Sequence, residues 1–245
     1  TNINRAISTS DIIFICVGTP TRKGSIKVDL SFVYKCTKEI LKYSKRKKII
    51  VTKSTVPVGT GDEIEKILKK KKKLFTVISN PEFLREGEAI RDFRYPDRIV
   101  IGSNEKKAFN TMRKLYAPLI NKGSKFFTTS RRGAELIKYA SNAFLATKIT
   151  FINELANLCE KSGVNIEDIS LGMGSDSRIG GRFLRAGPAY GGSCFPKDTK
   201  GLVSAAEKYK INLSVVKSVI KSNQERVNLL TKRVHKILGS NLKNK

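Results

Sequence analysis

The order in which apolar segments follow one another constrains the fold of this chain more than any other feature of its sequence. Over about the first 130 of its 245 residues, short runs of continuous apolar residues alternate with stretches of helical periodicity. The predicted strands are residues 11–17, 48–52, 74–79, 98–101 and 125–128, and the predicted helices are residues 31–43, 63–68 and 105–116. Because strands without polar alternation are buried on both faces, this order predicts a parallel sheet covered by helices on each side.

The pattern changes near residue 131, beyond which only helices are predicted. These helices cover residues 135–162, 166–172, 198–209 and 213–238. The first of them is apolar nearly all round, so we expect most of it to be buried. We therefore predict an α/β domain over residues 1–131 and an all-helical domain over residues 132–245.

The predicted sheet has the segment order of a doubly wound, Rossmann-like domain but lacks the usual beginning of one. Such a domain opens with a strand, a GxGxxG turn and a helix whose N-terminus binds a pyrophosphate. No GxGxxG occurs in the chain, and Gly172-Met173-Gly174 lies among predicted helices, where a helix terminus is the simpler interpretation. The predicted fold class is therefore α/β, a partial doubly wound parallel sheet that starts inside the sheet, followed by an all-helical domain.

Composition restricts the partners and the compartment. The formal net charge of +27 comes with two lysine-rich runs, residues 45–48 and 69–73. Each run lies between a predicted helix and a predicted strand, without interleaved aromatic residues, so a lysine-rich surface is favoured over a nucleic-acid site. No apolar run approaches the roughly 20 residues that span a bilayer, and the N-terminus lacks a signal-peptide pattern. We expect a cytoplasmic protein with no membrane or nucleic-acid partner, whose charge favours anionic ligands.

Cysteine and histidine usage argues against several kinds of site. The four cysteines, Cys16, Cys36, Cys159 and Cys194, are widely spaced and form no cluster with histidine, so neither a metal site nor a disulfide framework is expected. The first three lie in apolar stretches and are expected to be buried. The single histidine, His235, lies in the last predicted helix, which argues against a histidine-assisted hydrolase.

Cys194 differs from the other cysteines in its neighbours. It ends the segment Gly191-Gly192-Ser193-Cys194, where the glycines allow a ligand to approach the backbone closely. Lys197 and the basic surroundings favour the thiolate, which is the reactive form of cysteine. On these residues alone, a nucleophile and an ordinary loop cysteine are equally good interpretations.

Three further sets of polar residues stand where functional groups often lie. Lys138 and Asn142 are four positions apart, so they share one face of a predicted buried helix; a lysine that extends to solvent is the alternative. Residues 80–87 follow a predicted strand and carry two carboxylates, but an ordinary strand-to-helix turn would look the same. Thr19 and Thr55 stand just beyond strand ends, each closely followed by proline, which is a weak signal singly.

Together these residues resemble the UDP-glucose dehydrogenase family, nucleotide-sugar dehydrogenases that oxidise an alcohol to a carboxylate in two NAD-dependent steps. Six segments carry the resemblance, in the family's order, along almost the whole chain. They are residues 17–21, 53–60, 80–87, 96–102, 175–180 and 191–198. The resemblance implies an NAD-binding, Rossmann-like domain over residues 1–131 and a helical central and dimerisation domain over residues 132–245.

The resemblance also implies catalytic roles. Cys194 would attack an aldehyde intermediate, giving a thiohemiacetal that hydride transfer converts to a thioester, which water then hydrolyses. Lys138 and Asn142 would hold the oxygen on the reacting carbon. The residues implied to position or activate water and to transfer protons are Glu86, Thr55 and Asp198.

The ligands and partners follow from the same resemblance. NAD would be the cofactor and UDP-glucose the substrate, and the last long helix would build a homodimer. Thr19, Thr55, Glu86 and Lys197 would line the cofactor site, and Arg178 would reach the active site of the neighbouring subunit. The residues implied to contact the sugar nucleotide are Glu82, Phe83, Leu84, Arg85, Glu86, Lys138, Asn142, Arg178, Phe183, Leu184, Arg185, Ala186, Gly187 and Gly191.

Two parts of the family pattern are not found in this sequence. The first βαβ unit with its glycine turn is missing, and so is a C-terminal domain that would bind the nucleotide half of the substrate. We therefore expect the isolated chain to bind NAD and UDP-glucose poorly, to turn over little, and to leave one sheet edge bare. The alternatives are a sister dehydrogenase for GDP-mannose or a UDP-N-acetylhexosamine, and a non-catalytic remnant or basic interaction module.

Overall fold

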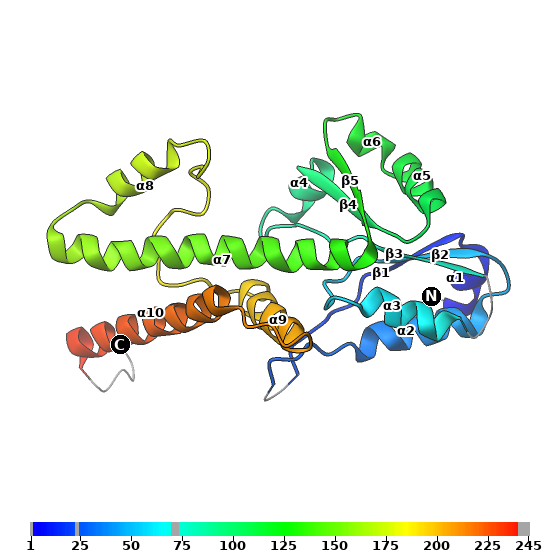
Figure 1. Ribbon diagram of the computed structural model, residues 1–245, viewed down its shortest axis with the longest axis horizontal. Helices are drawn as coiled ribbons and strands as arrows, with labels where there is room; N and C mark the ends of the chain where they lie inside the picture. Colours follow the sequence, from blue (N-terminus) through cyan, green and yellow to red (C-terminus); the bar gives the residue numbers. More distant parts are fainter. Residues whose placement is uncertain (1, 23–24, 70–73, 240–245) are drawn as a thin grey trace. The chain divides into compact units, whose positions relative to one another are not determined.

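The computed structural model describes residues 2–22, 25–69 and 74–239, arranged in two compact units (Figure 1). The first unit covers Thr1–Lys138 and the second Tyr139–Lys245, so the division falls inside one long helix, α7 (Arg131–Ser162). The domain boundary predicted from the sequence lies at residue 131, where this helix begins, and it stays a prediction. Each unit has hydrophobic clusters of its own.

The first unit is built on a sheet of five strands in the order β1-β2-β3-β4-β5. The strands are β1 (Ile12–Ile15), β2 (Lys48–Thr52), β3 (Phe75–Ser79), β4 (Arg98–Gly102) and β5 (Lys125–Thr129). Strands β1, β2 and β3 pair in parallel, as do β4 and β5, which confirms the predicted α/β sheet. The prediction of an entirely parallel sheet is wrong at one place, because β3 and β4 are antiparallel.

The connection between β3 and β4 explains this reversal. Two parallel neighbours need a crossover element that packs on the sheet. The only helix between β3 and β4 is the short α4 (Ala89–Arg94), which buries none of its side chains and therefore does not serve as such a crossover.

The seam between β3 and β4 is held mainly by side chains. The two strands share a single register pair, Ser79 with Gly102. Beside it, the buried Asn80 donates from Nδ2 to the Val100 carbonyl oxygen at 2.9 Å and accepts from the Tyr116 hydroxyl at 2.6 Å. These buried bonds replace much of the missing backbone ladder.

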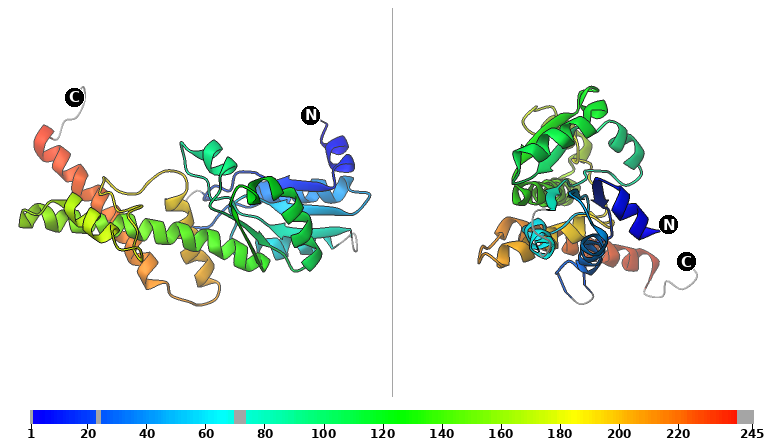
Figure 2. Two further views of the ribbon diagram at one scale, coloured as in Figure 1. Left: turned by 90° about the horizontal axis from the view of Figure 1, so that it is seen from above. Right: turned by 90° about the vertical axis from the view of Figure 1, so that its right-hand side faces the viewer.

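Helices cover both faces of the sheet (Figures 1 and 2). Alternate residues of β2 point to opposite faces, so Ile50 packs in a cluster with α2 (Ser31–Tyr43) and α3 (Thr60–Leu68), whereas Val51 packs in a cluster with α5 (Lys106–Leu115). The helices α1 (Ile3–Thr9), α4 and α6 (Ala117–Ile120) were not predicted, since each is too short to show periodicity.

The two outermost strands are less buried than their apolar sequences predict. Phe14 of β1 is 37% exposed and Phe127 of β5 is 51% exposed. Within the described residues, each of these strands has one partner strand only. Cys16 follows the last paired residue of β1 and is exposed, so its predicted burial is wrong, whereas Cys159 is buried as predicted and Cys36 is partly buried.

The second unit is helical, as predicted. Besides the greater part of α7 it contains α8 (Ile166–Gly174), α9 (Phe195–Glu207) and α10 (Ser214–Leu238). Helix α9 packs closely on α7, because a Cβ added to Gly201 would lie 2.7 Å from Cε1 of the buried Tyr139. Helix α7 is less buried than predicted: Phe144, Phe151 and Leu158, spaced by seven residues, are 66%, 48% and 62% exposed.

Part of the first lysine-rich run has a structural role. Lys48 is buried, and its Nζ donates to the carbonyl oxygens of Ser10 at 2.6 Å and Ser8 at 3.3 Å. Of the second run, residues 70–73 lie outside the described residues. Over the described ranges, no helix is both long and apolar enough to cross a bilayer, and no three acidic, cysteine or histidine side chains are placed to hold a metal ion.

Candidate functional site

The segments that follow β1 and β2 are tied together by hydrogen bonds. Thr19 is buried, and its Oγ1 donates to the Thr55 carbonyl oxygen at 2.8 Å. Nearby, Ser54 Oγ donates to the Val17 carbonyl oxygen at 2.6 Å. The two threonines predicted to line the cofactor site therefore lie together at the carboxyl ends of neighbouring parallel strands, where open α/β sheets bind ligands.

The loop after β3 carries a buried ion pair beside an aromatic ring. Lys138, whose side chain is 4% exposed, places Nζ 3.2 Å from Glu82 Oε1, so the alternative of a lysine extending to solvent is wrong. The same Nζ lies 5.4 Å from the centroid of the Phe83 ring, and the Arg98 guanidinium lies over that ring at 4.0 Å. Two cations thus flank Phe83, and a cation held over a ring face is attracted by its negative π-system.

Lys53 belongs to this neighbourhood and was not singled out from the sequence. Burial lowers the pKa of its ammonium to about 8, an effect that Lys138 reinforces and that Glu82 and Cys16 oppose. The sequence carried one signal for this residue, because Lys53 comes directly after an apolar strand. A lysine at the end of a buried strand has little room to extend its ammonium group into water.

The rest of the loop after β3 is fixed by its own side chains. Glu82 Oε2 accepts the Leu84 N–H at 2.5 Å. Arg85 donates to Asp92 from Nε at 2.9 Å and from Nη2 at 2.6 Å, and this bonding lowers the pKa of Asp92 to about 2. The guanidinium of Arg85 is therefore engaged inside the loop, while the Glu86 side chain is exposed.

Glu135 joins the start of α7 to the rest of the first unit. Its Oε2 accepts the Gly59 N–H at 2.7 Å, and its Oε1 accepts the Gly61 N–H at 2.8 Å and the Ser79 hydroxyl at 3.0 Å. Burial raises its pKa to about 7, although these donors act in the opposite direction. Because Glu135 lies three residues before Lys138, this joint helps to place the lysine.

We expect Glu135→Gln to weaken the pH dependence of stability between about pH 4.5 and 7. The pKa of Glu135 is raised from 4.5 to about 7, so its contribution to stability is complete below pH 4.5 and is lost as the pH rises through 7. At about 1.4 kcal/mol per pKa unit, this loss amounts to about 3 kcal/mol. Urea unfolding of both proteins across this pH range measures it. Parallel pH profiles for wild type and variant would contradict the expectation.

In the second unit, a buried carboxylate lies one helical turn beyond Cys194. Asp198 is 1% exposed; its Oδ2 accepts from Asn142 Nδ2 at 2.6 Å and its Oδ1 from Lys197 Nζ at 2.5 Å. Cys194 is the N-cap residue of α9, with Ser193 Oγ 3.7 Å from its Sγ. A helix N-terminus carries a partial positive charge, which favours binding of anionic groups there.

The segment before Cys194 is folded against α8 and α9. Phe183 has a left-handed backbone (φ 66°), and its ring meets Phe195 edge-on at 6.2 Å. Leu184 is buried, and its carbonyl oxygen accepts from Ser170 Oγ at 2.7 Å. Ala186 and Gly187 are partly buried, whereas Arg185 and Gly191 are exposed.

Arg178 is held by its own chain. Its guanidinium donates to Asp176 at 2.6 to 3.2 Å while its side chain remains 87% exposed. It is oriented at the surface of the second unit, and its predicted role in a neighbouring subunit stays a prediction.

The structure therefore brings predicted residues together inside each unit. In the first, Thr19 joins Thr55, and Lys138 joins Glu82 and Phe83. In the second, Asp198 joins Asn142 and Lys197. The functional role of each residue stays a prediction.

Comparison with known proteins identifies this arrangement. Residues 1–120 match the NAD binding domain of the UDP-glucose/GDP-mannose dehydrogenase family, and residues 132–225 match the central domain of the same family. The chain belongs to the UDP-glucose/GDP-mannose dehydrogenase family. The resemblance found in the six sequence motifs is thereby confirmed.

Individual members of this family resemble the chain closely. It is 48% identical to the UDP-glucose 6-dehydrogenase of Rhizobium meliloti (strain 1021), over 99% of this chain and 56% of that protein. It is 52% identical to the UDP-glucose 6-dehydrogenase of Rickettsia prowazekii (strain Madrid E), over 95% of this chain and 54% of that protein. The chain thus spans about half the length of the curated relatives it matches.

Solved structures of the family share the fold. A UDP-glucose dehydrogenase from Pyrobaculum islandicum superposes with a TM-score of 0.91 at 35% identity, covering 97% of this chain and 56% of that one. A GDP-mannose dehydrogenase from Pseudomonas aeruginosa superposes with a TM-score of 0.67 at 32% identity, covering 95% and 56%. These likenesses confirm the Rossmann-like sheet followed by a helical region.

The matched family domain is an NAD binding domain, and the backbone after β1 has open space beside it. A Cβ added to Gly18 would meet no atom within 4 Å, so a ligand can approach the backbone between Val17 and Thr19. The sequence contains no GxGxxG turn for the pyrophosphate. The end of β1 therefore leaves room for a ligand beside Gly18, but the pyrophosphate turn of a dinucleotide site is not found in this sequence.

Proposed function

We propose that this chain carries the reacting residues of an NAD-dependent dehydrogenase that oxidises UDP-glucose to UDP-glucuronate. The observation that carries the proposal is the start of α9, where Cys194 stands at the helix N-terminus and the buried Asp198 is fixed by Lys197 and Asn142. The substrate is taken from the relatives named UDP-glucose 6-dehydrogenase.

The proposed reaction has two oxidations that share one carbon. In the first, the alcohol loses a hydride and its hydroxyl proton and becomes an aldehyde. Cys194 Sγ then forms a bond to the aldehyde carbon, giving a thiohemiacetal. Loss of a second hydride and of the thiohemiacetal's hydroxyl proton leaves a thioester. Water then attacks the thioester carbon and breaks the carbon–sulfur bond, which releases the carboxylate, the thiolate and two protons. NAD supplies the hydride acceptor for both steps.

Charged and polar side chains are proposed to stabilise the oxygen on the reacting carbon and to transfer protons during the reaction. Lys138 is a fixed cation, and a preorganised cation stabilises an oxyanion as it forms. Asn142 can donate a hydrogen bond to the same oxygen. Thr55, Glu86 and Asp198 position or activate water and carry protons.

Binding is assigned to the strand ends and to two loops. Thr19, Thr55, Glu86 and Lys197 line the cofactor site in this proposal. Residues 82–86 and 183–187, with Arg178 and Gly191, contact the sugar nucleotide. Phe83 supports this assignment, because two cations lie over its ring and cations also attract anionic ligands.

We also propose that the helical unit forms a homodimer with a second copy of the chain. Phe144, Phe151 and Leu158 form an exposed apolar stripe on α7 with the seven-residue spacing of a helix–helix seam. On α10, Val227 and Val234 repeat this spacing at 40% and 44% exposure. An apolar surface of this kind usually marks an interaction site.

Replacing both Phe144 and Phe151 with serine is expected to convert a dimer into a monomer. The two rings are exposed, so their loss removes apolar area from the interface and little from the core. Sedimentation equilibrium of wild type and variant measures the change, with Phe32→Ser, an exposed phenylalanine of α2, as the control. A monomeric wild type, or a variant that still dimerises, would contradict the proposal.

The function is tested in a hybrid enzyme. The chain replaces the matching segment of the Rhizobium meliloti enzyme, which supplies the remaining parts of the family's architecture. NADH formation is followed with UDP-glucose, GDP-mannose and UDP-N-acetylglucosamine in parallel with the chain alone. We expect two NADH per UDP-glucose from the hybrid, and little from the chain alone or from the other sugars. Preference for another sugar would favour a sister dehydrogenase, and no turnover at all would favour a non-catalytic module.

A further inference from the structure

We propose that Asn223 and Arg226 of α10, together with Asn153 of α7, are positioning residues that hold the segment leading to Cys194. This inference rests on the proposed function, since it concerns how the reacting thiol is placed. It assigns a task to α10, which carries none of the predicted catalytic residues.

Asn223 bonds to both backbone polar groups of one residue. Its Oδ1 accepts the Tyr190 N–H at 2.8 Å, and its Nδ2 donates to the Tyr190 carbonyl oxygen at 3.0 Å. A side-chain amide used in this way imitates a neighbouring strand and fixes the backbone in two directions. Tyr190 is buried and stands four residues before Cys194.

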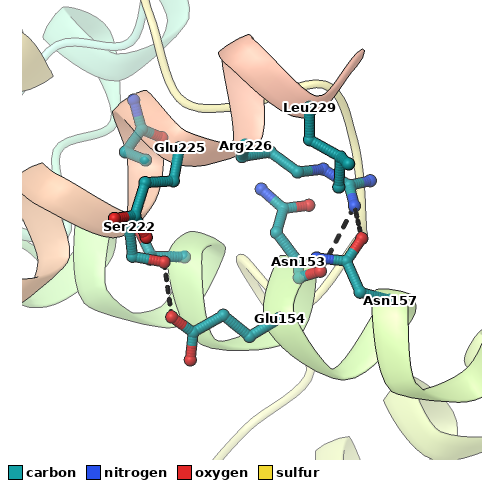
Figure 3. A pocket seen from close by; sticks show the side chains of 9 residues that line it. Asn153, Glu154, Asn157, Ser222, Glu225, Arg226 and Leu229 are labelled. Atoms are coloured by element: carbon teal, nitrogen blue, oxygen red, sulfur yellow. Dashed lines mark hydrogen bonds between the residues drawn. The ribbon is translucent and has the colours of Figure 1, made fainter. Parts of the chain in front are cut away.

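Arg226 and Asn153 together bond to both backbone polar groups of Gly187. Arg226 donates to the Gly187 carbonyl oxygen from Nε at 3.2 Å and from Nη2 at 3.1 Å, and Asn153 Oδ1 accepts the Gly187 N–H at 2.7 Å. The guanidinium itself is held by Asn157 Oδ1 and by the Asn153 carbonyl oxygen (Figure 3). Both ends of residues 187–190 are therefore anchored to helices.

This anchoring matters because glycines, whose backbone can adopt many conformations, come directly after Tyr190. Gly191 and Gly192 follow, and Gly192 takes a left-handed conformation (φ 73°) that glycine adopts easily. A Cβ added to Gly191 would meet no atom within 4 Å. Tyr190 is thus fixed by hydrogen bonds from α10 four residues before Cys194, and its ring also packs edge-on against Phe195 at 6.1 Å.

The anchoring side chains lie beside a poorly filled region of the helical unit. A cavity of about 260 Å³ adjoins Arg226, Asn153 and Asn157 between α7 and α10 (Figure 3). On its wall, the buried Thr150 Oγ1 and Asn153 Nδ2 have no hydrogen-bond partner among the described residues. Removing one anchor would leave its backbone groups facing this poorly filled region.

The anchor is tested first in the full chain by hydrogen exchange. We expect Asn223→Ala to speed exchange of the Tyr190 amide by about tenfold or more, while amides within α9 and α10 keep their protection. Asn223→Asp keeps the acceptor for this N–H and should give an intermediate rate. The matched control is Asn228→Ala on the exposed side of α10. Equal loss of protection across α9 and α10 would overturn the proposal, because it indicates general unfolding.

The positioning role is then tested by kinetics in the hybrid enzyme. We expect Asn223→Ala to lower kcat by about tenfold or more with an unchanged KM for NAD, because misplacement of a reacting group costs rate rather than cofactor binding. Asn223→Asp should recover part of the loss, and Asn228→Ala should match wild type. If the wild-type hybrid is active and Asn223→Ala leaves its kcat unchanged, the positioning role is overturned and the proposed function stands. If the wild-type hybrid is inactive, the proposed function is overturned, and this inference with it.

Discussion

Replacing Cys194 with serine in the hybrid enzyme is expected to lower formation of the carboxylate product by about a thousandfold or more. A serine hydroxyl is far less nucleophilic than a thiolate and has no histidine beside it to act as a base, since the single histidine of the sequence lies in α10. The fold should be unaffected, because Cys194 is only partly buried and the two side chains are similar in size.

The measurement follows NADH and product together. Quenched reactions are analysed by mass spectrometry for UDP-glucuronate, and wild type is additionally examined for an adduct on Cys194. Cys36→Ala is the matched control, because Cys36 packs against the hydrophobic core of the first unit and has no role in the proposed reaction. Undiminished UDP-glucuronate formation by Cys194→Ser would show that the thiol takes no part in the reaction.

Replacing Lys138 with methionine is expected to lower both turnover and stability. Turnover should fall by about a hundredfold or more, because a fixed positive charge is lost from the reacting oxygen. Stability should fall by about 1–3 kcal/mol, since the Glu82 carboxylate, 25% exposed, loses its partner at 3.2 Å. Steady-state NADH formation and urea unfolding measure the two effects.

A second substitution separates the two effects. Glu82→Gln/Lys138→Met removes both charges of the pair, so part of the lost stability should return while turnover stays low. Lys161→Met, an exposed lysine of the same helix, is the control for removing a positive charge. Recovery of turnover in the double variant would mean that Lys138 acts only through its ion pair and not on the substrate.

The fold was predictable from the sequence to the extent that it depends on local pattern. Continuous apolar runs such as residues 48–52 predicted all five strands, because burial on both faces leaves that signature. The direction of β4 was not predictable in this way. Strand direction depends on how the chain between β3 and β4 packs, and hydrophobic periodicity does not report this.

The residues of the candidate site were likewise predictable only where local sequence brings them together. Residues inside compact motifs, such as Cys194 and Asp198 on one turn of α9, were predictable because the motif itself brings them together. Glu135 and Asn223 were missed, because their partners are distant in sequence: Gly59 lies 76 residues before Glu135, and Tyr190 lies 33 residues before Asn223. Such bonds exist only once the tertiary structure has formed.

The seam between β3 and β4 affects how the first unit opens locally. One register pair, the bonds of Asn80 and a shared apolar cluster that includes Ile78 and Ile101 join two blocks of strands that are each paired along their length. Hydrogen-bonded blocks with a thin junction tend to open as separate cooperative units. The loop that holds Glu82 and Phe83 leaves the sheet at this junction. Opening at this junction would therefore break few backbone hydrogen bonds, and its cost would come from exposing the apolar cluster that β3 and β4 share and from the bonds of Asn80.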